Sequence, residues 1–232
     1  MSGLNGATMA IRLSARLCDL IQPGSASSRS NRNRECGFSM VEMVVVVALI
    51  LVISAMAIFA LQPALQDARF DAAMRQVLDQ LRQAREYSIT NHRYVQVTFP
   101  VVVSAGVTQY EVQMTQLNAV PFGPGGANTV LSTISIQPPA RFYVFPAPVP
   151  DTPDNFGDSS SIVFEGTNNG PPGGMMFQSD GEFVDKATFQ AINGTVFLGL
   201  PGQSTSARAV TLLGSTGRVR GWKGTGATWF QF

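Results

Sequence analysis

Residues 43–61 form an apolar run, MVVVVALILVISAMAIFAL, in which Ser54 is the only polar side chain. At a rise of about 1.5 Å per residue, a helix of this length spans roughly 28 Å, close to the thickness of a bilayer's hydrocarbon core. Five arginines precede the run, whereas Asp67 and Asp71 follow it. Because positive charge stays on the cytoplasmic side, we expect a cytoplasmic N-terminus and an outer C-terminal part. The run therefore predicts a single-pass inner-membrane anchor.

An ordinary secretory signal would be cleaved after such a run, and an uncleaved anchor is the other simple alternative. Glu42 argues for a third interpretation, because it lies at the cytoplasmic edge of the run. A carboxylate within lipid costs several kcal/mol unless it finds a partner, so an acid at this place indicates function.

The segment Cys36-Gly37-Phe38-Ser39-Met40-Val41-Glu42 resembles the prepilin processing motif. The resemblance implies that prepilin peptidase cuts after Gly37 and N-methylates the new terminal Phe38. Residues 1–37 would then be a leader. A leader of 37 residues is long for this family, so Met9 is an alternative start.

Cleavage would create a cationic amine at Phe38, one helical turn from the Glu42 carboxylate. Neither charge is stable alone in lipid, so Glu42 of one subunit is expected to neutralise the terminal amine of a neighbour in a filament. Such pairs are best attested as devices that fix register. The sequence therefore predicts Gly37 and Phe38 as processing residues and Glu42 as an assembly residue, with membrane lipid around the helix.

The leader also contains both cysteines, Cys18 and Cys36, so a chain cut after Gly37 has no thiol and no disulfide. A lipoprotein site at Cys36 is disfavoured, since the charged pair Arg34-Glu35 stands where apolar and small residues are needed. The leader carries five arginines and two acids, and subtracting its charge of +3 from the formal +1 of the chain leaves −2. The remainder is not a generic binder of polyanions.

Residues 62–92 have the pattern of an amphipathic helix. Pro63 follows the membrane run and is expected to kink or loosen the helix. The ion pairs Asp71–Arg75 and Asp79–Arg82 are expected within the helix. Its apolar stripe, which should pack on a sheet, comprises Phe70, Ala73, Val77, Leu81, Ala84 and Ser88.

Beyond His92 the pattern changes to the alternation of strands. Strands are predicted at 93–99, 109–115, 141–145, 161–165, 195–200, 207–213 and 217–222, and loops rich in Pro, Gly and Asn at 120–128, 146–158 and 166–174. The predicted fold is α+β, with one long helix packed on antiparallel sheets. The predicted division is a leader (1–37), a transmembrane half-helix (38–61), an amphipathic half-helix (62–92) and a periplasmic head (93–232).

Three segments of the predicted head and helix resemble the GspH/FimT-type pseudopilins: RQAREYSITNHRYVQVTF (82–99), FQSDGEF (177–183) and VTLLGSTGRVRGW (210–222). This resemblance implies a minor pseudopilin of a type II secretion system. Its partners would be prepilin peptidase, other pseudopilins and an inner-membrane assembly platform.

The alternative is a FimT-like minor type IV pilin that binds DNA for uptake. Gly217-Arg218-Val219-Arg220 is similar to the stretch that carries DNA binding in those pilins. Arg218 and Arg220 would share one face of a strand and contact adjacent phosphates, and Trp222 and Trp229 would stack on bases. Alternating arginines on a solvated face, and tryptophans in the core, are the simpler interpretation.

An enzyme is not predicted. The single histidine, His92, ends the long helix, and we find no nucleophile with a matching base, no phosphate-binding loop and no expected cofactor. Asp151, Asp154 and Asp158 offer oxygen ligands for Ca²⁺, but in a Pro- and Gly-rich loop they are more simply turn-forming residues.

Overall fold

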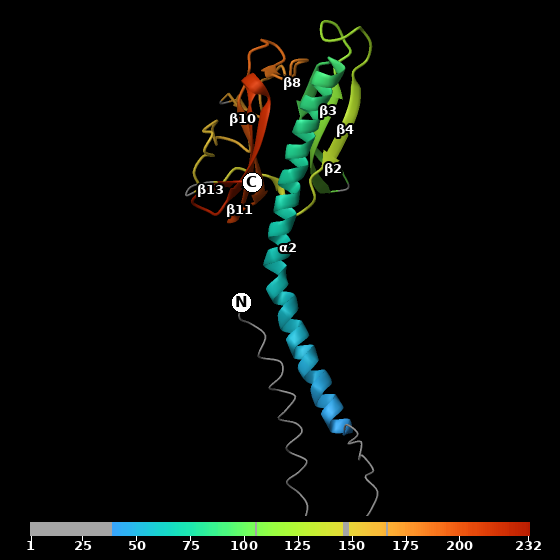
Figure 1. Ribbon diagram of the computed structural model, residues 1–232, viewed down its shortest axis with the longest axis vertical. Coiled ribbons are helices and arrows are strands. Elements are labelled where there is room, and N and C mark those ends of the chain that lie inside the picture. The colour runs from blue at the N-terminus through green and yellow to red at the C-terminus, as the bar shows by residue number, and fades with distance from the viewer. Residues whose placement is uncertain (1–38, 105, 146–148, 166) are drawn as a thin grey trace, which may run out of the picture. The chain divides into compact units, whose positions relative to one another are not determined.

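The computed structural model describes residues 39–104, 106–145, 149–165 and 167–232 (Figure 1). The chain divides into two compact units, Met1–Leu51 and Val52–Phe232. The described part of the first unit consists of Ser39 and the start of helix α2, which runs from Met40 to Asn91. The predicted leader, including Gly37 and Phe38, lies outside the described residues.

Helix α2 continues through Pro63 without ending there. Its C-terminal half buries the predicted apolar stripe: Phe70, Ala73, Val77, Leu81, Ala84 and Ser88 are all buried. Met74 and Leu78 widen this stripe by one position on each turn, as expected for a helix that is covered on two sides. The predicted amphipathic helix is confirmed.

The first sheet has the order β2-β3-β1-β8-β9, with β4 on the other side of β3. Its strands are β1 (Val95–Thr98), β2 (Val101–Ser104), β3 (Val107–Gln116), β4 (Thr129–Ser135), β8 (Met175–Phe177) and β9 (Phe183–Asp185). All its pairings are antiparallel. The predicted Asp-Gly turn joins β8 to β9, with the Glu182 amide donating to Asp180 Oδ1 at 3.0 Å.

The second sheet has the order β13-β12-β11-β10-β6-β7, with β5 paired to β10. Its strands are β5 (Arg141–Phe142), β6 (Ile162–Phe164), β7 (Thr167–Asn168), β10 (Gly194–Leu200), β11 (Gln203–Leu213), β12 (Arg218–Gly224) and β13 (Trp229–Gln231). These pairings are also antiparallel. A short 3₁₀ helix, η1 (Gly214–Thr216), turns the chain from β11 into β12.

The C-terminal half of α2 lies between the two sheets, with β3 and β4 on one side and β10 and β11 on the other (Figure 1). On the first side, Ser132 Oγ of β4 lies 3.5 Å from Gln80 Oε1. On the second side, Gly221 of β12 lies close to the helix, and a Cβ added to Gly221 would lie 2.9 Å from Cδ1 of Leu78. One apolar cluster draws on the helix and on both sheets. The predicted α+β fold is confirmed.

Each predicted strand overlaps an observed strand, but their bounds differ. The segment 141–145 is paired only at Arg141–Phe142. The strands β2, β4, β7, β9 and β13 were not predicted, and β7 lies within the predicted loop 166–174. The sequence of β4, TVLSTIS, explains its omission, because the strand borders the sheet, is largely exposed and does not alternate apolar with polar residues.

Candidate functional site

The start of helix α2 is the first candidate site. Every side chain from Met40 to Ile58 is exposed, and Glu42 lies in the first helical turn. The Met43 amide donates to the Ser39 carbonyl at 3.1 Å, so the backbone is helical from this point. A carboxylate is favoured here by the partial positive charge of a helix N-terminus. Among the residues that the structure describes, Glu42 is an exposed acid in the first turn of the apolar helix.

Helix α2 is long and apolar enough to cross a membrane, and none of its most apolar 18-residue window is buried within the protein. A run of exposed valine, leucine, isoleucine and methionine side chains is unfavourable in water, since each contributes about 1.5–3 kcal/mol when it is buried. The described residues of this run therefore require lipid or neighbouring helices around them.

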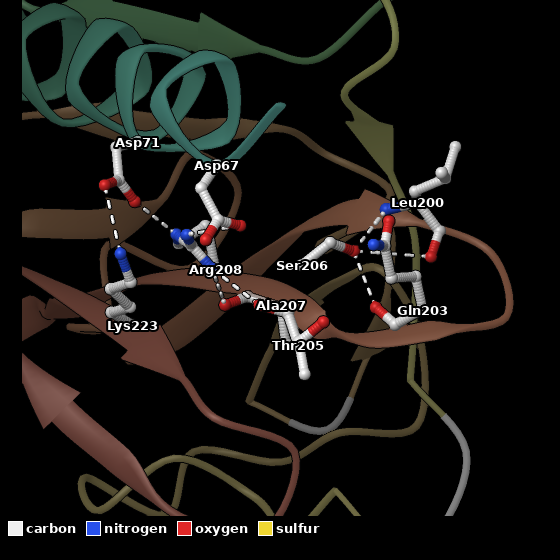
Figure 2. Close-up of polar contacts among 9 residues, drawn as sticks. All are labelled: Asp67, Asp71, Leu200, Gln203, Thr205, Ser206, Ala207, Arg208 and Lys223. Carbon is white, nitrogen blue, oxygen red and sulfur yellow. Dashed lines mark hydrogen bonds and ion pairs between the residues drawn. The ribbon is translucent and has the colours of Figure 1, made fainter. Parts of the chain in front are cut away.

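Helix α2 is anchored to the second sheet by a buried arginine (Figure 2). Arg208 of β11 is fully buried, and its Nε donates to Asp71 Oδ1 at 2.5 Å. Lys223 Nζ of β12 lies 3.2 Å from Asp71 Oδ2, so two cations from adjacent strands meet one helical carboxylate. The predicted intrahelical pair Asp71–Arg75 is wrong, because both oxygens of Asp71 are engaged by the sheet.

A second nitrogen of Arg208, Nη1, is oriented by the turn that leads into β11. Nη1 donates to the carbonyls of Thr205 at 3.1 Å and Ala207 at 2.9 Å. Ser206 Oγ holds this turn, donating to the Gln203 carbonyl at 2.7 Å and accepting from the Leu200 amide at 2.9 Å (Figure 2). A planar guanidinium with fixed donors can be held by such a set of oxygens, which a lysine could not match.

This contact changes the acidity of Asp71. Burial on its own raises the pKa of a carboxyl group, but the hydrogen bonds and charges of Arg208 and Lys223 outweigh burial here. Together they lower the pKa of Asp71 below its ordinary value of 3.8. Asp67 contributes a longer contact, with Oδ1 at 3.8 Å from Arg208 Nη2. We call Asp67, Asp71, Arg208 and Lys223 the anchor cluster.

Arg218 and Arg220 share one face of β12, as predicted, but they have different surroundings. Arg218 is exposed, whereas Arg220 Nη1 contacts Asp154 Oδ1 at 2.5 Å. Trp222 is buried, and its Nε1 donates to Thr211 Oγ1 at 2.9 Å. The simpler interpretation, a tryptophan in the core, is therefore confirmed for Trp222, and the alternative in which it stacks on bases is wrong. The charge of Arg220 is already matched by an acid.

Trp229 is also committed to the protein, since its Nε1 donates to the Pro150 carbonyl at 2.9 Å. The segment around Val149 and Thr152 thus covers this face of the second sheet, and Trp229 packs against two buried apolar clusters there. The face of the second sheet considered for DNA binding is therefore partly covered by this segment.

The three aspartates considered for Ca²⁺ do not converge. Asp151 closes its own loop, accepting from the amides of Thr152 at 2.6 Å and Gly157 at 2.8 Å. Asp154 instead accepts from Thr211 Oγ1 at 2.5 Å as well as from Arg220. Within residues 149–165 and the other described ranges, no three His, Cys, Asp or Glu side chains are placed to hold a metal ion.

Comparison with known proteins identifies the class of the N-terminal segment. The family described as "Prokaryotic N-terminal methylation motif" matches residues 32–58, which include Gly37, Phe38 and Glu42. No curated protein sequence matches the chain significantly. Among solved structures, the chain is similar to the minor pseudopilin EpsH from the type 2 secretion system of Vibrio cholerae. That similarity has 14% identity and a TM-score of 0.38, and it covers 66% of this chain and 95% of the other.

The chain therefore combines this methylation motif with one long helix that packs on antiparallel sheets, an arrangement similar to that of type IV pilin-like proteins. The motif, followed by one apolar helix, also indicates that the chain is anchored in a membrane.

Sequence reasoning missed the anchor cluster, although the sequence carried a signal for it. In β11, Arg208 alternates in step with Val210 and Leu212, both of which face the core. An arginine on the apolar face of a strand has to find an acid, because a buried charge without a partner is strongly destabilising.

Proposed function

We propose that this chain is a minor pseudopilin of a type II secretion system. In this proposal, prepilin peptidase cuts after Gly37 and N-methylates Phe38. The mature subunit is held in the inner membrane with its N-terminus in the cytoplasm and its head in the periplasm. It then joins other pseudopilins at an inner-membrane assembly platform and acts as a structural subunit, not as a catalyst.

One observation supports processing and assembly most strongly. The methylation-motif match coincides with the start of a helix whose side chains from Met40 to Ile58 are all exposed. Glu42 is an ionisable residue in the first turn of that apolar helix. A pair between Glu42 and the amine of a neighbouring Phe38 would remove two unfavourable charges from lipid and set the axial register.

The resemblance of three segments to the GspH/FimT group is compatible with both candidate functions, and the contacts of the residues considered for DNA binding are what favour the secretion system. Arg220 is bonded to Asp154, and Trp222 is buried. Of the residues considered for DNA uptake, Arg218 is the one that remains exposed without an acidic partner among the described residues. These contacts favour the secretion function over DNA binding.

Processing is tested by co-expressing the chain with prepilin peptidase and measuring intact mass. Wild-type protein should lose its first 37 residues and gain one methyl group. Gly37→Val should remain uncut, since the peptidase needs a small residue before the cut. Gly24→Val, a change at another leader glycine, should be processed normally. Equal processing of both variants would contradict the assignment of the site.

Assembly is tested by Glu42→Gln, with Asp79→Asn as a matched change at an exposed acid of the same helix. Glu42→Gln should be processed but should not enter sheared filaments, whereas Asp79→Asn should enter them. Deleting the gene should stop the secretion of type II substrates and leave DNA uptake intact. The reverse phenotype would favour the FimT-like alternative.

A further inference from the structure

A cavity of about 730 Å³ lies between the last turns of α2 and the turn from β11 into β12. Three arginines line it: Arg82 and Arg85 from the helix and Arg218 from the start of β12. Glu86 is the one acid in the lining. The ion pairs found among the described residues involve Arg208, Arg220 and Lys223, and none involves these three arginines. We call this cavity the arginine groove.

One hydrogen bond and one tight turn shape the wall of the arginine groove. Arg85 Nε donates to the Thr216 carbonyl at 3.1 Å and so ties the helix to η1. Gly217, with φ of 59°, makes the left-handed turn out of η1, and a Cβ there would lie 2.0 Å from the Gly181 carbonyl oxygen. Arg218, the first residue after this turn, lines the groove together with Arg82, and both of these side chains are exposed.

The lining also decides which anion fits. Three guanidinium groups favour carboxylates or phosphates, which they can bind through paired hydrogen bonds. Ile89 adds a partly exposed apolar surface, which the apolar side chains of a peptide can cover and a continuous phosphate backbone would leave uncovered. The tryptophans nearest in sequence are engaged elsewhere, Trp222 in the core and Trp229 with Pro150, so neither is available to stack a base.

We propose that the arginine groove binds a short acidic peptide segment of a partner protein. Carboxylates of that segment contact Arg82, Arg85 and Arg218, and an apolar side chain between them packs on Ile89. The volume suits such an occupant, because pockets that enclose small ligands are about 300–1,000 Å³. This site is distinct from Glu42 and from the anchor cluster, and its occupation does not depend on leader processing.

The test uses the full chain in zwitterionic detergent micelles and fluorescence anisotropy of a labelled, end-blocked peptide of alternating Glu and Leu. We expect saturable binding that weakens with salt, and no binding of the matching Gln-Leu peptide. Arg82→Gln with Arg218→Gln should weaken binding about tenfold or more, since two charge-assisted contacts are lost. Neither side chain makes a hydrogen bond with another described side chain, so the fold should be unchanged by near-UV circular dichroism.

Two further variants make the test specific. Arg69→Gln, at an exposed arginine of the same helix outside the groove, should bind like the wild type. Glu86→Gln should bind the acidic peptide more tightly, because it removes a repulsive charge. The proposal would be overturned by equal losses in Arg69→Gln and the double variant, by weaker binding of Glu86→Gln, or by a thymidine oligonucleotide that displaces the peptide and binds more tightly.

Discussion

Replacing Asp71 with Asn should destabilise the head by about 3 kcal/mol. The substitution keeps the shape of the side chain but removes the charge that matches Arg208, which is fully buried. Removing one partner of a buried pair costs about 3–5 kcal/mol, because the other charge remains buried and uncompensated. Asp67, at 3.8 Å from Arg208 Nη2, offers partial compensation, so the lower end of this range applies.

Variants at the other residues of the anchor cluster, and at an acid outside it, provide the controls for Asp71→Asn. Lys223→Gln removes the partly exposed half of the cluster and should cost about 0.5 kcal/mol, as surface ion pairs do. Asp79→Asn, at an exposed acid outside the described ion pairs, should cost almost nothing. Arg208→Met combined with Asp71→Leu should be far less destabilising than Asp71→Asn, since apolar replacement of a whole buried pair is often neutral.

The assay is equilibrium urea unfolding of the full chain in micelles, followed by tryptophan fluorescence. Trp222 is buried in the second sheet, so its emission reports on the packing of the head. A loss in Asp71→Asn no greater than in Asp79→Asn would refute the reasoning. So would a double variant as unstable as Asp71→Asn, because the loss would then come from shape and not from an unpaired charge.

Three further predictions concern the same head. Because the folded pKa of Asp71 is lowered, its stabilisation is complete above the ordinary value of 3.8 and is lost as pH falls through the folded value; urea titrations should show this acid loss in wild type and little of it in Asp71→Asn. Gly217→Ala should lower the free energy of unfolding by about 1–3 kcal/mol, because both the left-handed backbone and the Gly181 carbonyl oppose a Cβ. Gly202→Ala is the control, since Gly202 is also left-handed but has open space where its Cβ would lie. Asp154→Asn should destabilise the loop over the second sheet, seen as faster proteolysis within 149–158, because Arg220 would lose its charged partner; unchanged cleavage would count against that contact.

The sequence predicted the structure well wherever the spacing of apolar residues along a helix or strand determined which face is buried. The 3.6-residue recurrence from Phe70 to Ser88 predicted the buried face of α2, and two-residue alternation located most of the strands. Side-chain partners across the fold were not predictable in this way. Asp71 lies four positions from Arg75, the local partner that the pattern favours, yet it bonds Arg208, which is 137 positions away.

The same limit applied to the candidate site. The pattern of β12 placed Arg218 and Arg220 on one face, but it contained no information on the loop that brings Asp154 to Arg220. Register within a hairpin is a local property, whereas the covering of a sheet face depends on a distant loop. The arginine groove likewise combines the end of α2 with a turn more than 120 positions later, as the contact of Arg85 with Thr216 illustrates.

The most direct test of the account is the chemical identity of the N-terminus of the protein isolated from its native membranes. Terminal sequencing and mass spectrometry should find a chain that begins with N-methylated Phe38, directly before the helix that carries Glu42. A native chain that retains residues 1–37, or that begins after the apolar run, would contradict it.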